Sequence, residues 1–408
     1  MPETLRSGAW LTRARRTTYA WIFLALSAVA LVALVATSDG LVARDGKPLG
    51  TDFSNVYAAG RLVLKGEAPA AYDWDIQHAE EKAVFGREDI PFYGWHYPPF
   101  FLALAALLAT MPYLLALFVW QATTFALYLR LAARIVPGRE TLLLAAAFPA
   151  VFVNFGHGHN GFLTTALLAG ALLVLDRRPI LAGLLIGLLA YKPQFGLLIP
   201  LVLVATGRWQ TFFAAATTVL AMAAIATAAF GIDVWPAFIA SLEPTRTIVL
   251  EAGSTGWEKI QSIFAAVRMW GGTVPAAHAA QGVVTLLVAA ALVWQWRRPV
   301  AFELKAAALC LASLLATPYT LDYDMVLVGG ALAFLARHGL RTGFGPYEIS
   351  LAAIAWTAPL IARQVATYTA IPIGALATLA LFTLILLRTQ RDARATQNPS
   401  PEIRHALA

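Results

Sequence analysis

Long apolar runs separated by short polar connections recur along the chain from residue 19 to residue 387. The first run, residues 19–37, approaches the ~20 residues that an α-helix needs to cross a bilayer. It follows a basic segment with Arg13, Arg15 and Arg16. A cleaved secretory signal has a shorter apolar core, so we expect this run to be kept as the first membrane helix.

The same pattern predicts eleven further crossings, which makes twelve. The segment 98–129 is uncharged and is broken at Pro112. Two crossings there would move Arg130, Arg134 and Arg139 to the external side of the membrane and reverse the side of every later connection. We therefore expect one crossing, preceded by a half-inserted or interfacial helix at 98–110. Several runs are shorter than ~17 residues and need tilt, flanking polar positions or a thinned bilayer. The eleven are 112–131, 141–155, 161–175, 179–190, 193–206, 209–232, 274–296, 306–318, 325–336, 349–362 and 367–387.

Basic residues concentrate in alternate connections, which fixes the expected orientation. By the positive-inside rule these connections face the cytoplasm, and both termini lie there too. The tail 388–408 is then cytoplasmic, and we expect it to be disordered. The basic groups are Arg130, Arg134 and Arg139; Arg177 and Arg178; Arg208; Arg297, Arg298 and Lys305; Arg337 and Arg341; and Arg388, Arg391 and Arg394.

Composition agrees with an all-α polytopic membrane protein and excludes a soluble globule. Of the 408 residues, 59% are hydrophobic and 13% are charged, about half the ~25% charge of soluble domains. No polar half separates from the rest, so residues 1–387 form one membrane domain. The net charge of +7 reflects the orientation, and no nucleic-acid-binding motif accompanies it. Cys310 is the single cysteine, so no intrachain disulfide or CxxC motif exists.

The largest non-membrane segment is the external loop 39–97, which contains Asp52. Between Phe53 and Lys65, apolar residues are interrupted by polar ones in the way that is typical of an amphipathic helix at the membrane interface. The aromatic residues Trp74 and Trp95 suit a position among lipid headgroups. Two interpretations of Asp52 are open. Either Thr51 caps a helix whose first turn Asp52 stabilises, or the carboxylate of Asp52 is functional.

Three other external connections carry polar residues on the side of Asp52. Lys192 has no acidic neighbour in sequence and must either extend to the interface or meet an anion. His157 and His159 are a weak zinc signal, since no cysteine or HExxH helix accompanies them. Asp322 and Asp324 suit a divalent cation or the cap of the following helix, and capping is favoured for at least one of them.

Four motifs in order resemble glycosyltransferase family 87: TDFSNVYAAG, WHYPPF before a Pro-broken run, GxxxGLLAYKPQ and TPYTLDYD. This family comprises membrane enzymes of the GT-C class that use polyprenyl-phosphate sugars. The resemblance implies an inverting transfer with Asp52 as general base, and places Lys192, Pro193 and Gln194 near the donor phosphate. Some relatives carry a histidine pair at the position of Tyr323 and Asp324, so neither a histidine role nor a mannose donor carries over.

The expected reaction is the transfer of a hexosyl or pentosyl group to a lipid or glycan acceptor on the external face of a bacterial plasma membrane. A base must take the acceptor proton and a cation must stabilise the leaving phosphate, roles that Asp52 and Lys192 suit. No cofactor is required, although a divalent cation stays open. Membrane lipids are the further expected partners. Candidate substrate-binding residues are Arg61, His96, Tyr97, His157, His159, Asn160, Tyr319, Asp322, Tyr323 and Asp324.

Two other classes of function are compatible with parts of the pattern. A secondary transporter would show inverted repeats and polar groups near the midplane, whereas the candidate residues here gather at one face. A polyprenyl-linked glycan ligase or a membrane acyltransferase is the other alternative. An acyltransferase would use a histidine base, so His157 would then matter more than Asp52.

Overall fold

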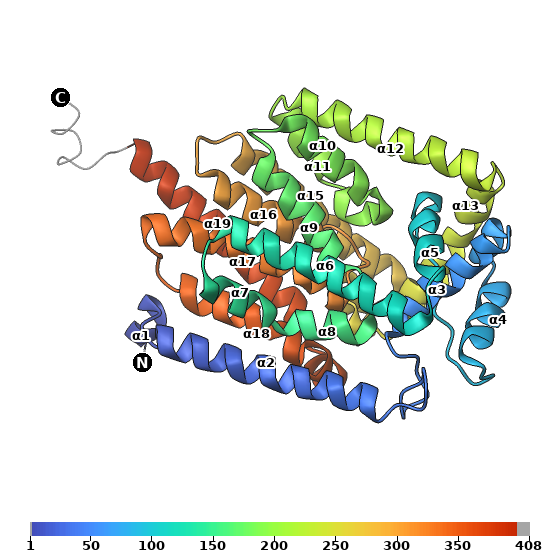
Figure 1. Cartoon of the computed structure of the whole chain (residues 1–408). Helices are drawn as coiled ribbons and strands as arrows, with labels where there is room; N and C mark the ends of the chain where they lie inside the picture. The colour runs from blue at the N-terminus through green and yellow to red at the C-terminus, as the bar shows by residue number, and fades with distance from the viewer. Residues whose placement is uncertain (1, 398–408) are drawn as a thin grey trace.

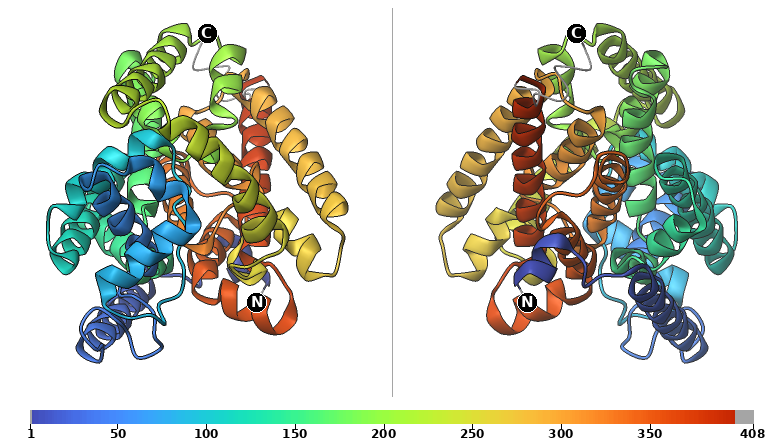
Figure 2. Two further views of the ribbon diagram at one scale, coloured as in Figure 1. Left: turned by 90° about the vertical axis from the view of Figure 1, so that its right-hand side faces the viewer. Right: turned by 90° about the vertical axis from the view of Figure 1, so that its left-hand side faces the viewer.

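The computed structural model describes residues 2–397, and the regular elements of this part are helices (Figures 1 and 2). Its β-type pairings are isolated bridges, such as the one between Asp39 and Val42. Most helices run roughly along one direction in Figure 1, with α2 at one edge of the bundle and α12 at another. The expected all-α polytopic membrane protein is confirmed at this level.

Six helices among the described residues are long and apolar enough to cross a membrane. A seventh span exists if α7, Arg139–Ala146, and α8, Pro149–His157, count as one, although they meet at 51°. Proline cannot donate a backbone hydrogen bond inside a helix, so Pro149 starts a new helix where the sequence predicted one crossing. The six are α2 Arg13–Ala36, α6 Tyr113–Ile135, α12 Trp209–Phe230, α15 Val274–Trp296, α18 Glu348–Thr369 and α19 Ile373–Gln397.

The number of twelve crossings is not supported, because several predicted runs fold as shorter helices. These are α9 Gly161–Val174, α10 Pro179–Leu188, α11 Ile199–Ala205, α16 Phe302–Leu315 and α17 Val326–Thr342. The short α10 packs closely against α12. A Cβ on Gly187 would lie 2.4 Å from Thr218, so glycine is required for this approach.

The centre of the bundle is α16, which packs against α15, α17 and α19. Its residues from Ala306 to Leu315 are all buried, including Cys310. Small alanines allow the neighbouring helices to approach, and the larger leucines fill the remaining space. This packed centre fixes the positions of the surrounding helices and of the connections at their ends.

The predicted external loop, residues 39–97, folds into packed helices. It contains α3 Thr51–Leu64, the 3₁₀ turn η1 Ala68–Tyr72 and α4 Trp74–Phe85, followed by η2 Pro99–Phe101 and α5 Leu102–Ala109. Four consecutive residues of α3, Phe53 to Val56, point in all directions around the helix axis and are all buried. The structure does not support the prediction of an interfacial helix around Phe53 to Lys65, because α3 packs against α4 and α5 within the protein. Trp95 is 1% exposed and does not belong to an aromatic belt.

Ion pairs join the basic connections at the end of the bundle away from α3 and α4. Arg16 contacts Glu140 at 2.7 Å, and Arg208 contacts Asp176 at 2.6 Å. The predicted tail begins inside α19, which continues to Gln397. Residues 398–408 lie outside the described part of the chain.

Candidate functional site

A cavity of about 1040 Å³ opens at the end of the bundle formed by α3, α4 and α13, Val234–Pro244 (Figure 1). Its walls come from segments far apart in sequence: the start of α3, residues 91–98, the end of α8, residues 191–194, the π-helical turn η5 Thr245–Glu251, residues 254–259, residues 319–324 and α18. The lining is mixed and includes charged residues as well as apolar residues such as Phe238 and Leu242.

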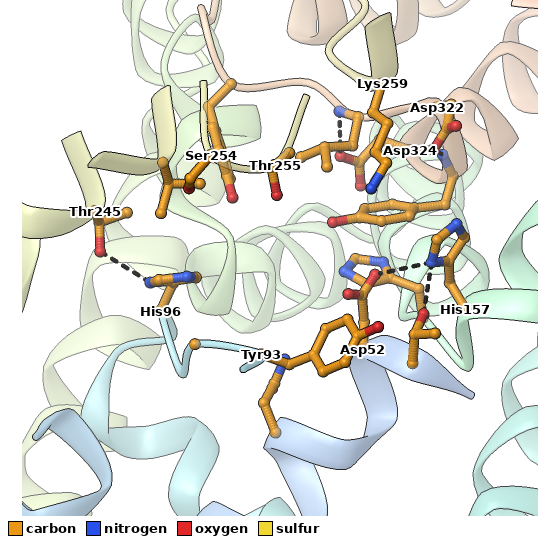
Figure 3. Close-up of a pocket in the computed structure, with 18 of the residues that line it drawn as sticks. Asp52, Tyr93, His96, His157, Thr245, Ser254, Thr255, Lys259, Asp322 and Asp324 are labelled. Carbon is orange, nitrogen blue, oxygen red and sulfur yellow. Dashed lines mark hydrogen bonds and ion pairs between the residues drawn. The ribbon is translucent and has the colours of Figure 1, made fainter. Parts of the chain in front are cut away.

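Asp52 lies in the first turn of α3 and faces this cavity (Figure 3). The helix begins after Gly50, whose φ of +67° favours glycine. Thr51 is not the cap: its hydroxyl contacts Nδ1 of His157 at 2.8 Å. The Oδ2 atom of Asp52 has no hydrogen-bond partner, although His157 Nδ1 lies 3.4 Å away. The side chain of Asp52 is 20% exposed and lines the cavity, so its carboxylate can meet a substrate there.

The environment of Asp52 raises its pKa to about 7, because burial disfavours the carboxylate and the charge of Asp322 adds to the effect. The positive charges of Lys259, Lys192 and Arg363 act in the opposite direction. A carboxylate with a pKa close to neutral pH suits a general base.

A second buried acid, Glu81 on α4, lies behind α3. It accepts hydrogen bonds from the Ser54 hydroxyl at 3.0 Å and from the Tyr93 backbone N–H at 3.1 Å. Burial raises the pKa of Glu81 to about 8. Glu81 therefore joins α3 to the loop before Trp95 mostly as a neutral acid.

A chain of polar contacts leads from Asp52 across the cavity wall to α18. His157 Nε2 lies 3.0 Å from Nη2 of Arg363. The Arg363 Nε group donates to Oδ2 of Asp322 at 2.7 Å. Asp322 is 2% exposed, so its charge is compensated by this guanidinium.

Lys192 meets an anion within the protein. Its ammonium lies 2.6 Å from Oδ1 of Asp324, and both side chains are buried. The other oxygen of Asp324 accepts the backbone N–H of Leu321 at 3.0 Å. The expected capping role of one of the two aspartates is thus confirmed for Asp324, and Lys192 does not extend to the interface.

A layer of stacked rings lies between the two ion pairs. The ring of Tyr323 stacks on His159 with centroids 3.5 Å apart. His159 Nε2 contacts the Tyr97 hydroxyl at 3.2 Å, and the Asn160 amide donates to the same hydroxyl at 2.8 Å. Burial together with the charge of Lys192 lowers the pKa of His159, so its ring is neutral.

The opposite wall carries polar groups with few partners. His96 Nδ1 contacts the Thr245 hydroxyl at 2.8 Å, and burial lowers the pKa of His96 to about 4. Ser254, Thr255 and Lys259 extend toward the cavity from the segment after η5 (Figure 3). Within residues 2–397, the ammonium group of Lys259 has no ion pair or hydrogen bond. It is a cation that a bound anion can reach.

Most candidate residues from the sequence line this one cavity. They are Asp52, His96, Tyr97, His157, His159, Lys192, Gln194, Tyr319, Asp322, Tyr323 and Asp324. Asn160 lies one layer behind, and Arg61 points elsewhere and contacts Glu80 at 2.6 Å. Lys259 and Arg363 also line the cavity and belong to none of the sequence motifs. An arginine directly after an apolar run is costly in a membrane and was the available signal for Arg363.

The described residues contain no cluster of three His, Cys, Asp or Glu side chains arranged to hold a metal ion. Asp322 and Asp324 do not form a pair facing one point, since each binds a different cation of the protein. The histidines also diverge: His157 contacts Arg363, and His159 contacts Tyr97. Neither motif that suggested a metal has the arrangement of a metal site.

The fold and the site define a polytopic membrane protein with a large cavity, lined in part by charged residues, at one end of its bundle. Residues 95–318, more than half of the chain, match the model of glycosyltransferase family 87. The chain belongs to this family and is a membrane glycosyltransferase. No curated protein and no solved structure matches it. The matched segment contains His157 and Lys192 but neither Asp52 nor Asp322.

Proposed function

We propose that the protein transfers a sugar from a polyprenyl-phosphate donor to a hydroxyl of a lipid or glycan acceptor, with inversion at the anomeric carbon. The observation that carries this proposal is the partly exposed carboxylate of Asp52 in a cavity that also contains an unpaired lysine, Lys259. A base and a cation in one chamber match the two charges that develop during the transfer.

In the proposed step, Asp52 accepts the proton of the acceptor hydroxyl. The acceptor oxygen forms a bond to the anomeric carbon while the bond from that carbon to the phosphate oxygen breaks. The electron pair of the broken bond stays on the polyprenyl phosphate, which leaves with additional negative charge. Attack from the face opposite the leaving group inverts the anomeric configuration.

The leaving phosphate is stabilised by Lys259 and Lys192. Lys259 offers an unpaired ammonium, and the hydroxyls of Ser254 and Thr255 extend from the same segment (Figure 3). Lys192 lines the cavity and keeps donor capacity beyond its bond to Asp324, because an ammonium has three protons. A metal is not needed for this charge. The apolar wall with Phe238, Leu242 and Ile248 provides a surface for the polyprenyl chain.

The proposal is tested with the purified protein, a polyprenyl-phosphate sugar and membrane lipid extract. We expect release of polyprenyl phosphate together with a glycosylated product of opposite anomeric configuration, without any ion gradient. Uptake of a solute into proteoliposomes with no consumption of the donor would instead identify a transporter.

Replacing Lys259 with alanine should raise the apparent KM for the donor about tenfold, because a charge-assisted contact to phosphate is lost. The measurement is donor kinetics at saturating acceptor. Lys82→Ala is the matched control, since Lys82 contacts Glu88 on the outer surface of α4. Equal donor KM values in Lys259→Ala and the wild type would remove Lys259 from the phosphate site.

The cavity is proposed to face the exterior of a bacterial plasma membrane, with both termini in the cytoplasm. A cysteine replacing the exposed Glu67 should react with an impermeant maleimide in intact cells whose outer membrane is permeabilised. A cysteine replacing the exposed Arg177, at the basic end, should react only after the inner membrane is opened. The reverse pattern would invert the orientation.

A further inference from the structure

His157 is held at both ring nitrogens by groups from different elements. Nε2 lies 3.0 Å from Nη2 of Arg363 on α18. Nδ1 lies 2.8 Å from Oγ1 of Thr51 and 3.4 Å from Oδ2 of Asp52, both at the start of α3. The ring therefore bridges α18 and the helix that carries the proposed base.

The partner at Nε2 determines the tautomer. A guanidinium group has only N–H donors and keeps its proton, so Nε2 must accept and cannot carry hydrogen. The proton of the neutral ring then lies on Nδ1 and points toward Thr51 and Asp52. Arg363 is itself fixed, because it binds the buried Asp322 through Nε at 2.7 Å and Nη2 at 2.5 Å.

We propose that Asp322, Arg363 and His157 form a positioning relay that keeps His157 neutral with its proton on Nδ1 beside Asp52. This inference rests on the proposed function, in which Asp52 takes the acceptor proton. The relay has two consequences. His157 donates from Nδ1 to Thr51 Oγ1 at 2.8 Å and so fixes the first turn of α3, with the same N–H 3.4 Å from Oδ2 of Asp52. His157 also has no free lone pair with which to act as the base itself.

A proton on Nε2 of His157 would place two hydrogen-bond donors, or two positive charges, against each other. A proton on Nε2 would point at the N–H groups of Arg363, and a doubly protonated ring would put two cations 3.0 Å apart. An acyltransferase-type mechanism with His157 as base is therefore disfavoured by the contacts of Arg363.

The first test reads the tautomer directly and does not depend on activity. In protein labelled with ¹⁵N at histidine, the His157 signals, assigned by their loss in His157→Asn, should show a protonated Nδ1 and an unprotonated Nε2 at neutral pH. A proton on Nε2, or on both nitrogens, would overturn the relay whatever reaction the protein catalyses.

The second test separates positioning from proton transfer. The amide of His157→Asn can replace the Nδ1–H donor, whereas the longer side chain of His157→Gln places its amide near the position of Nε2. We expect kcat to fall less than about tenfold in His157→Asn and by roughly 10²-fold in His157→Gln, with donor KM little changed in both. Equal, near-complete loss in two variants that unfold at the wild-type temperature would mean that the imidazole itself transfers the proton.

A third variant removes the relay without leaving a buried charge unpaired. Arg363→Met combined with Asp322→Asn deletes both charges of the pair. The Nδ1 tautomer should then lose its preference in the ¹⁵N spectrum, and kcat should fall while donor KM stays near the wild-type value. A spectrum unchanged from the wild type would show that Arg363 does not fix the ring.

Discussion

Asp52→Asn should reduce turnover by ~10² or more and leave donor binding nearly unchanged. Asparagine preserves the size of the side chain and its place in the first turn of α3, but its amide cannot accept the acceptor proton. Because Gly50 precedes the helix and Thr51 is bonded to His157, Asp52 is not the cap whose loss would unfold α3. The measurement is kcat and donor KM of the purified variant, with its unfolding temperature.

Glu81→Gln is the matched control for this variant. Glu81 is a buried acid close to Asp52, but its pKa of about 8 leaves it mostly neutral, so an amide replaces it with little change of charge. We expect a much smaller effect on turnover than in Asp52→Asn. Folded Asp52→Asn protein that turns over at the wild-type rate would eliminate the base role, and the catalytic carboxylate would then have to be sought at Asp322 or Asp324.

The same carboxylate predicts a pH dependence. Its pKa is raised to about 7, so the protonated form dominates below that pH and cannot accept a proton. The turnover should therefore fall on the acid side of about pH 7 and level off above it. Asp322→Asn removes the negative charge that helps to raise this pKa, so the fall should move to lower pH. A profile flat from pH 5 to 8 would contradict the assignment.

Lys192→Ala should destabilise the folded protein by about 3–5 kcal/mol, because it leaves the buried carboxylate of Asp324 without its cation. The measurement is the unfolding temperature in detergent, with Lys192→Arg as the variant that keeps a cation at the position. Loss of activity in Lys192→Ala alone therefore does not identify a phosphate contact.

The double variant Lys192→Met with Asp324→Asn separates the two roles of the lysine. It removes both charges, and an asparagine can still accept the Leu321 N–H. We expect its stability to return close to that of the wild type, while its donor KM stays raised because the phosphate has lost one cation. A wild-type donor KM in the folded double variant would leave Lys192 with a structural role only.

The arrangement of helices was predictable where the apolar pattern was long. The expected runs 209–232 and 274–296 correspond to α12 and α15. The pattern failed where proline or burial within the protein mattered more than lipid. Pro149 divides one expected crossing into two helices, and α3 packs against both α5 and α4 within the protein.

The position of the site was predictable, but its internal contacts were not. Polar residues at the predicted external ends of several runs indicated one face, and Asp52, His157, Lys192 and Asp322 do line one cavity. The partner of Lys192 could not be inferred, since Asp324 lies 132 residues away and the pattern of one segment carries no information on the other. Lys259 belongs to no motif, and only the fold shows that its ammonium reaches the chamber.

The separation of Lys192 from Asp324 also sets an order of events during synthesis. The lysine leaves the ribosome and enters the membrane 132 residues before its counter-ion is made. During that interval an unpaired lysine at membrane depth costs up to about 3 kcal/mol. It is therefore expected to stay near the lipid surface, or uncharged, until the late segment with Asp324 arrives. A chain truncated before Asp324 would then have its early helices in the membrane, but Lys192 would lack the carboxylate with which it pairs.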